Sequence, residues 1–190
     1  VGSKFKIDGR IAGTFALFDI EKDDIVVNLD DDTAQAIGKA RSRGAELDLT
    51  GQVSDTLRLI GALTYTDTEV LEDAGGLVGN WLPNAPRRAA SIAATYTPGW
   101  RTRSLPWQAN AAVRYVGERQ GDAANSVTLP SYTVADLGIG TQFTWNGMGL
   151  ELDFMLRNAF DRAYYPSADG SLRVLVGTPR QLGVRLRSTF

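Results

Sequence analysis

The chain has 190 residues with 22 acidic and 20 basic side chains, and it contains no cysteine or histidine. The nearly balanced charge leaves no basic surface for nucleic acid, and the missing cysteines exclude a disulfide framework and thiolate metal sites. The missing histidines remove the commonest acid–base group and metal ligand. No run reaches the roughly 18 apolar residues of a membrane helix. The length suits one domain, and the alternation of apolar and polar residues indicates its fold.

The patterning predicts an all-β chain of nine long strands. Alternating apolar and polar residues between turn signals place these strands near 1–7, 10–27, 38–50, 56–69, 87–98, 105–118, 131–145, 148–160 and 178–190. Globular strands usually have about 5–6 residues, whereas a tilted strand that crosses a membrane needs about 9–11. The lengths therefore favour a segment of an antiparallel up-and-down transmembrane β-barrel.

The connections between these strands alternate in length. Short turns lie at Asp8 and Gly9, at 52–55, and at Asn146 and Gly147, with a medium turn at 99–104. Long loops lie near 28–37, 70–86, 119–130 and 161–177. Outer-membrane barrels have short periplasmic turns and long outer loops, so this alternation predicts a periplasmic C-terminus.

Charged residues in the middle of the strands share one face. Within each strand their parity is opposite to that of the main apolar set, and they are Glu46, Asp48, Arg58, Arg114, Asp136, Glu151, Asp153, Arg157, Arg185 and Arg187. An arginine on the lipid face costs about 2–4 kcal/mol at the midplane, so we expect these side chains to line a wet lumen. Arg41, Arg43 and Asp67 break the parity, but they lie at predicted outer ends, where that cost falls toward zero.

The last strand combines both features. Its apolar face comprises Leu182, Val184, Leu186 and Phe190. Its other face carries Arg185 and Arg187. We expect these two arginines to pair with Glu151 and Asp153 of the preceding strand, because opposite charges on neighbouring strands stabilise a sheet.

Aromatic residues support the membrane interpretation. Those near the predicted periplasmic ends are Tyr96, Trp100, Trp107, Trp145 and Phe190, and those near the outer ends are Tyr65 and Tyr115. Barrels carry such rings as girdles at the two interfaces. A soluble sandwich or lipocalin-like barrel also alternates, so parity alone leaves it open. The facing of 10–27 stays open as well, because large apolar residues such as Leu17 and Phe18 occur on both faces.

Three stretches carry a family resemblance. They are ARSRGAEL at 40–47 with LIGALTYTD at 59–67, then GNWLPNAPR at 79–87, and LRNAFDRAYY at 156–165, closed by GTPR at 177–180. Their order and spacing resemble the C-terminal part of TonB-dependent outer-membrane receptors, especially ferric-siderophore receptors. The likeness covers essentially the whole chain.

The resemblance implies a parent receptor with a roughly 22-stranded barrel and an N-terminal plug. Residues 1–190 would supply its C-terminal strands, about nine of them, without the plug. Because a single-chain bacterial barrel has an even number of strands, nine strands indicate part of a larger barrel. No signal peptide is visible, so we expect the gene product to begin before Val1.

The implied function is TonB-energised uptake of a ferric siderophore, of the hydroxamate kind, across the bacterial outer membrane. The implied partners are the siderophore, the lipid bilayer, the TonB complex through the missing N-terminal part, and the barrel-assembly machinery. Phe190 would be part of the signal that this machinery recognises. A passive porin, a structural barrel and a soluble β-barrel binding module are the alternatives.

Four residues of the outer loops are candidate ligand contacts, namely Trp81, Arg119, Tyr164 and Tyr165. Trp81 could stack on a siderophore or pack under its own loop. The two tyrosines could instead belong to the girdle or to structural packing. Arg119 and Arg162 could attract an anionic ferric complex by long-range steering, or be ordinary solvated charges.

We expect no cofactor, no metal site and no enzyme activity. The aspartates at 30–32 suggest calcium ligands, but their spacing departs from the EF-hand loop. Glu151 and Asp153 form a carboxylate pair of the kind that hydrolases use, yet neighbouring arginines suffice to compensate them. Gly138 and Gly140 lack the following helix of a nucleotide site, so we expect them to face the lumen and pack against the plug.

Overall fold

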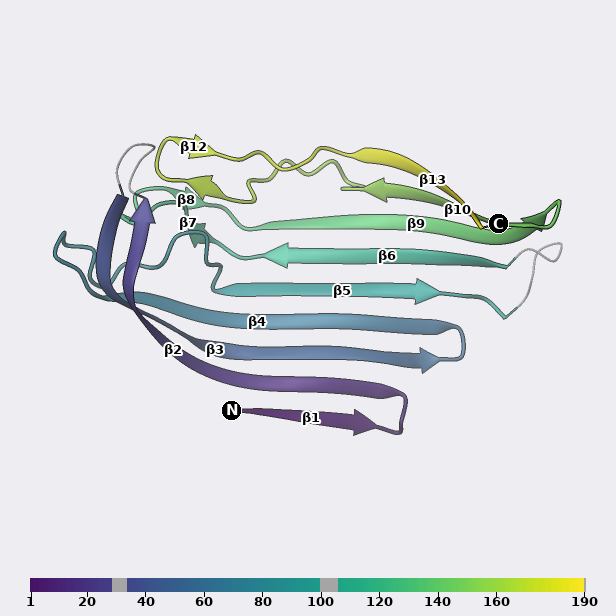
Figure 1. Cartoon of the computed structure of the whole chain (residues 1–190), viewed down its shortest axis with the longest axis horizontal. Coiled ribbons are helices and arrows are strands. Elements are labelled where there is room, and N and C mark those ends of the chain that lie inside the picture. The colour runs from purple at the N-terminus through teal and green to yellow at the C-terminus, as the bar shows by residue number, and fades with distance from the viewer. Residues whose placement is uncertain (29–33, 100–105, 190) are drawn as a thin grey trace.

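The computed structural model describes residues 1–28, 34–99 and 106–189, without the side chains of 24–28 and 34–37. Nine of its strands form one antiparallel sheet in the order β1-β2-β3-β4-β5-β6-β9-β10-β13 (Figure 1). Long strands that follow one another in the chain are neighbours in the sheet, so the predicted all-β, antiparallel, up-and-down architecture is confirmed. Among the described residues, no helix is long and apolar enough to cross a membrane.

The sheet strands are β1 (Gly2–Ile7), β2 (Ile11–Asn28), β3 (Ala34–Ser54), β4 (Leu57–Glu72), β5 (Arg88–Tyr96), β6 (Trp107–Val116), β9 (Tyr132–Trp145), β10 (Met148–Arg157) and β13 (Gln181–Thr189). Two short hairpins lie in the loops. One pairs β7 (Arg119–Gln120) with β8 (Thr128–Leu129), and the other pairs β11 (Ala168–Asp169) with β12 (Arg173–Val174).

The hairpin of β2 and β3 is longer than the sequence predicts. The expected loop at 28–37 begins beyond Asn28 and ends before Ala34, because Ile25 pairs with Ile37 and Val27 with Gln35. The β-branched residues of this part of β2 favour extended backbone. The predicted strand at 10–27 agrees with β2, so the difference lies in β3, which begins at Ala34. The sequence predicts its start at 38, because small and polar residues precede Ile37.

Figure 1 shows a curved sheet whose two ends differ. The β1–β2, β3–β4 and β9–β10 turns lie at one end with the C-terminus, and the long loops lie at the other. Asn146 and Gly147 have φ values of 48° and 83°, as the two-residue turn of a twisted hairpin requires. The predicted separation of short turns from long loops is therefore confirmed.

One face of the sheet is apolar and uncovered by any second layer of the described residues. On β13, Leu182, Val184 and Leu186 are 76%, 60% and 65% exposed. Residues in register share a face, and Val184 pairs with Phe154, which in turn pairs with Ile139. We call this surface the apolar face. Large apolar side chains are thus exposed together along one side of the sheet.

The register also settles the facing of β2. Phe15 pairs with Leu47, which places Phe15 on the apolar face. Phe18 pairs with Gly44 on the opposite face, and a Cβ atom at Gly44 would lie only 2.7 Å from the Phe18 ring. The glycine at position 44 therefore leaves room for the Phe18 ring and for the main chain of Tyr65 on the neighbouring strand.

The opposite surface, which we call the charged face, contains the predicted cross-strand ion pairs. Arg185 is in register with Asp153 and Arg187 with Glu151. The nitrogen–oxygen distances are 2.8 Å for Arg185–Asp153 and 3.2 Å for Arg187–Glu151. The pairing predicted for the last strand is confirmed.

The charges that break parity compensate one another. They lie on the apolar side of the sheet but toward the loop end, where Arg43 contacts Asp67 at 3.0 Å and Lys39 contacts Glu21 at 2.7 Å. Arg41 pairs with Asp19. A belt of ion pairs therefore follows the apolar residues where a membrane interface would begin.

Leu186→Arg tests the assignment of the two faces. If the apolar face lies in lipid near the midplane, this change is expected to cost about 2–4 kcal/mol. It should lower the yield of folded, heat-modifiable protein in outer membranes of cells that express the gene. Val184→Leu is the matched control, because it keeps an apolar side chain on the same face.

Arg185→Leu should disturb assembly less than Leu186→Arg, because it removes one charge from a compensated set and places none in lipid. Normal assembly of Leu186→Arg combined with failure of Arg185→Leu would mean that the two faces are inverted.

Candidate functional site

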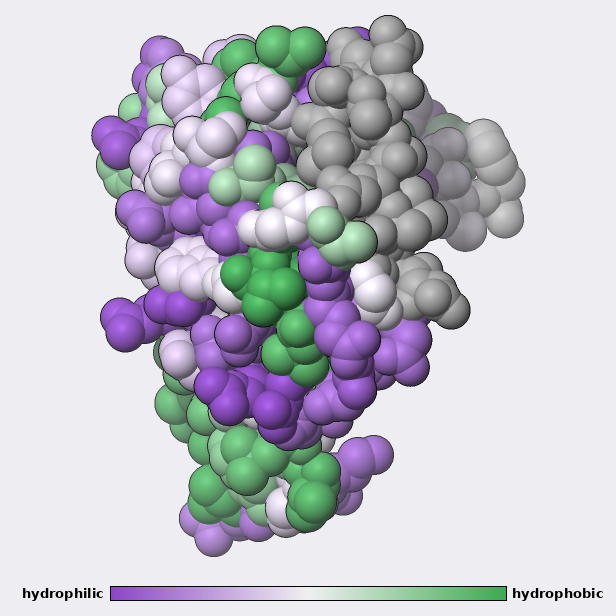
Figure 2. Space-filling model, turned by 90° about the vertical axis from the view of Figure 1, so that its left-hand side faces the viewer, coloured by the Kyte–Doolittle hydropathy of each residue, from purple (hydrophilic) through white to green (hydrophobic). Residues whose placement is uncertain are grey.

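Three long connections lie together at the loop end of the sheet (Figure 1). They are the first loop, 73–87, between β4 and β5; the second loop, 117–131, between β6 and β9; and the third loop, 158–180, between β10 and β13. Figure 2 looks onto this end, where hydrophobic patches lie between hydrophilic ones. Phe160, Leu172 and Val176 of the third loop are highly exposed apolar residues.

The first and second loops are joined by asparagine side chains. Asn125 accepts a hydrogen bond from the amide of Trp81 at 2.8 Å and donates one to its carbonyl oxygen at 2.9 Å. Asn80 donates to the carbonyl oxygen of Ala123 at 2.9 Å. A small core of Ala40, Val70, Leu77, Ala123 and Leu82 packs at the base of these loops.

The first and third loops are joined in the same way. Asn84 accepts a hydrogen bond from the amide of Ala168 at 2.9 Å and donates one to its carbonyl oxygen at 2.8 Å. The amide of Asn84 itself donates to the carbonyl oxygen of Gln120 in the second loop at 2.7 Å. A single asparagine therefore contacts both other loops.

Arg119 belongs to the second loop, contacts the third loop and is only 1% exposed. Its guanidinium donates to the carbonyl oxygens of Gly117 and Tyr165 and lies 5.4 Å from the centre of the Tyr132 ring. Burial lowers the pKa of this guanidinium, because desolvation penalises its charged form. In this arrangement Arg119 supports the loops from within, and its contact with a ligand stays a prediction.

Trp81 is half-buried in the first loop, at the loop end of β4 and β5. The guanidinium carbon of Arg87 lies 3.5 Å from the centre of the Trp81 ring, a cation–π contact. Arg87 also reaches Asp67 at 3.4 Å, and Asp67 accepts a hydrogen bond from Arg43. Asn125 therefore fixes the main chain of Trp81, and Arg87 covers one face of its ring.

The two tyrosines have different surroundings. The Tyr164 ring lies 4.5 Å from that of Tyr132, and a Cβ atom at Gly177 would approach it to 2.3 Å. Tyr164 is thus packed between Tyr132 of β9 and the main chain at Gly177. Tyr165 is 40% exposed and is the most accessible of the four candidate residues.

The sequence interpretation missed the asparagines whose side chains hold the loops together. Asn158 is 4% exposed, donates to the carbonyl oxygens of Arg162 and Thr178, and accepts from the Arg162 amide. Asn84, Asn125 and Asn158 have positive φ values of 59°, 56° and 45°. Asparagine is enriched among non-glycine residues in this region, so several asparagines in long loops were an available signal.

Other sequence predictions fall elsewhere. Phe190, Trp100 and the aspartates at 30–32 lie outside the described residues. Among the residues that are described, no group of three or more acidic, histidine or cysteine side chains could hold a metal ion.

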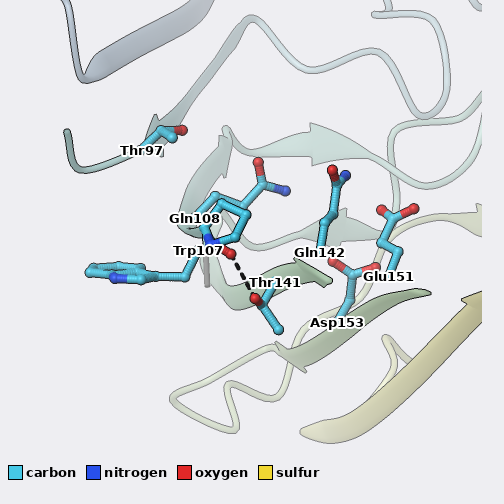
Figure 3. A pocket seen from close by; sticks show the side chains of 9 residues that line it. Thr97, Trp107, Gln108, Thr141, Gln142, Glu151 and Asp153 are labelled. Atoms are coloured by element: carbon cyan, nitrogen blue, oxygen red, sulfur yellow. Dashed lines mark hydrogen bonds between the residues drawn. The ribbon is translucent and has the colours of Figure 1, made fainter. Parts of the chain in front are cut away.

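A polar hollow opens on the charged face between β6, β9 and β10 (Figure 3). Gln108, Gln142 and Glu151 project to one side of the sheet, and Trp107 points away from them. The Thr141 hydroxyl donates to the carbonyl oxygen of Pro106 at 2.6 Å at its edge. Asp153 also lines the hollow, and both carboxylates of the hollow, Glu151 and Asp153, are paired with arginines of β13.

Gly140 has its role inside the sheet. It is in register with Asp153, and a Cβ atom there would lie 2.5 Å from the Asp153 carboxylate oxygen. The glycine therefore leaves room for the carboxylate that binds Arg185. Gly138 and Gly140 share the charged face, as predicted, and their packing against a plug stays a prediction.

Residues 1–159 match the family of TonB dependent receptor-like β-barrels. The chain belongs to the TonB-dependent receptors. It is 36% identical over 189 residues to the metal-pseudopaline receptor CntO of Pseudomonas aeruginosa strain UCBPP-PA14, covering 97% of this chain and 26% of that protein. It is 29% identical over 176 residues to the ferrioxamine receptor of Yersinia enterocolitica, covering 85% of this chain and 24% of that protein.

Solved receptor structures share the fold. The siderophore receptor PiuA from Acinetobacter baumannii superposes with a TM-score of 0.77 at 26% identity, over 98% of this chain and 27% of that one. The ferric yersiniabactin uptake receptor FyuA from Yersinia pestis gives 0.84 at 22% identity, over 100% and 29%. The chain thus spans about a quarter of the length of these TonB-dependent receptors, which are bacterial outer-membrane proteins.

Arg119→Ala should loosen the outer loops of this TonB-dependent receptor. The change removes hydrogen bonds from a charged group to two carbonyl oxygens, so we expect the loops to lose about 1.5–3 kcal/mol of local stability. Limited proteolysis of the folded receptor in detergent, with a protease that does not recognise arginine, should cut the loops faster.

Arg162→Ala is the control, because the Arg162 side chain is exposed in the third loop. Equal acceleration by the two variants would contradict the structural role of Arg119.

Proposed function

We propose that residues 1–190 form the C-terminal wall and outer loops of a longer TonB-dependent receptor that imports a ferric siderophore. The family membership supports the class of transport, and several relatives are receptors for iron chelates, among them the ferrioxamine receptors and the ferrichrome transporter. The TonB complex would act through a plug outside this chain, and the barrel-assembly machinery would recognise the terminal strand with Phe190.

The observation that carries this proposal is the joined set of outer loops above a two-faced sheet. The apolar face suits lipid and the charged face suits a wet interior. Trp81, with Arg87 against its ring, and the exposed Tyr165 lie in loops of the same cluster. Aromatic rings and arginines are suited to a bulky, anionic metal chelate, through stacking and charge.

A second substrate is favoured by one relative. The 36% identity to the metal-pseudopaline receptor exceeds that to the ferrioxamine receptor, so a metal–pseudopaline complex is the alternative cargo. Both cargoes are metal chelates, and they differ in the chelator that the loops would contact. A passive porin would have no plug, so the coding sequence upstream of Val1 distinguishes it from a receptor.

Trp81→Ala is expected to weaken binding of a ferric hydroxamate siderophore by the full-length receptor roughly tenfold, because a stacked ring at a binding site contributes on the order of 1 kcal/mol or more. Fluorescence quenching by the ferric complex, with the iron-free chelator as reference, gives the affinity. Trp145→Ala, at the opposite end of the sheet, is the control and should bind as the wild type does.

Binding of vitamin B12 or a carbohydrate in the absence of any bound metal chelate would overturn the substrate class. Equal affinities of Trp81→Ala and wild type would instead remove Trp81 from the binding site.

Single cysteines test the topology, because the chain contains no other cysteine. Asp169→Cys should react with a membrane-impermeant maleimide on intact cells, whereas Asn146→Cys and Gln52→Cys should react only after the outer membrane is opened. Asn80 and Asn125 are also predicted to be outside, but their side chains bind other loops, so Asp169 is the cleaner probe. Reversed labelling would reverse every strand direction.

A further inference from the structure

Asparagine side chains join the three outer loops by binding main-chain atoms of a neighbouring loop. Asn125 forms two hydrogen bonds with the peptide groups of Trp81, and Asn84 forms two with those of Ala168. A carboxamide that accepts and donates at once satisfies a peptide unit as a neighbouring strand would. We call each such pair of hydrogen bonds a bracket. A bracket uses only the N–H and C=O groups of its target residue, so it joins two loops through any target residue except proline.

The two brackets and Arg119 close a triangle. Asn125 links the second loop to the first, Asn84 links the first to the third, and Arg119 links the second to the third through the Tyr165 carbonyl oxygen. Every pair of loops is connected directly. Movement of one loop must then break contacts with both others.

Each bracketing asparagine also shapes its own loop. Asn84 and Asn125 have φ values of 59° and 56°, in the left-handed region that few side chains tolerate. The left-handed turn is where each side chain leaves its own loop and reaches the neighbouring one. The same residue therefore bends one loop and holds another.

We propose that Asn84 and Asn125 are positioning residues that make the first, second and third loops one preformed unit and that Asn125 sets Trp81 for ligand contact. A surface ordered before binding loses less conformational entropy when the ligand arrives. The coupling between loops stands on the hydrogen bonds alone, whereas its effect on affinity rests on the proposed transport function.

Asparagine-to-glycine changes separate the two roles of these residues. Glycine adopts positive φ without strain, so both changes keep the turn. Asn84→Gly removes the bracket to Ala168, and Asn125→Gly removes the bracket to Trp81 together with the longer hydrogen bonds from Asn125 to the carbonyl oxygens of Asp122 and Ala123 in its own loop. Asn125→Asp keeps the acceptor for the Trp81 amide and loses the donor. The control is Asn146→Gly, which makes the same change at φ 48° in the β9–β10 turn, at the other end of the sheet.

Amide hydrogen exchange of the full-length receptor in detergent reads the brackets from the partner loop. Asn125→Gly should raise exchange at Trp81, and Asn84→Gly at Ala168, at least about tenfold, because each of these amides donates to the altered side chain. Asn125→Asp should fall between Asn125→Gly and wild type. Asn146→Gly should leave both amides as in wild type.

A purely local role predicts the opposite pattern. Exchange would then rise only in the loop that carries the substitution, and wild-type protection of Trp81 in Asn125→Gly would overturn the proposal. Heat-modifiability should be unchanged in all variants, which shows that the barrel wall has folded.

Affinity for a ferric hydroxamate siderophore completes the test. Asn125→Gly should weaken it roughly tenfold while the folded fraction stays constant. If wild type binds no metal chelate but the exchange coupling is present, the transport function fails and the loop unit stands. If wild type binds and the coupling is absent, the loop unit fails and the function stands. Coupling lost without any change in affinity would overturn the positioning of Trp81.

Discussion

The fold depends on the two-residue period of extended backbone in a single uncovered layer. Successive side chains of a strand face opposite ways, and residues in register share a face. Once Val184 faces outward on β13, the register passes the same facing to Phe154, Ile139 and across to Phe15 on β2. A slip of one residue anywhere would exchange lipid-facing and water-facing side chains, which makes the register strongly specified.

The charged face shows how such a sheet carries polar groups without a core. Arg185 and Arg187 find their carboxylates directly across the strand, and Gly140 leaves the space that Asp153 occupies. The small residue Gly140 and the ion pair of Asp153 with Arg185 thus occur together on the same face. At the loop end, charged residues also lie on the apolar side of the sheet. Arg43 and Asp67 lie there, beyond the apolar residues, and compensate each other.

The sequence predicts most of the wall and little of the loops, for a physical reason. Nine strands, their order, the two faces and the pairing of Arg185 with Asp153 all follow from a local period, which any stretch of strand repeats. The extension of β3 at both ends and the facing of Phe15 were not predicted, because mixed residues weaken the period there. Arg119 is buried where it binds Tyr165 of the third loop and lies over Tyr132 of β9, and no local pattern in the sequence reports that Tyr165 comes so close.

The brackets of Asn84 and Asn125 contact the N–H and C=O groups of residues 81 and 168, so the hydrogen bonds exclude proline there but require no particular side chain. A receptor lineage can therefore exchange the chemistry that its loops display while the loop geometry persists. A loop residue that contacts the ligand can then be substituted with less risk of unfolding the loops. This separation gives related receptors a route to new cargoes by point mutation. It marks the half-buried position 81, rather than the buried Ala168, as one where an engineer can vary the side chain with the loop framework kept intact.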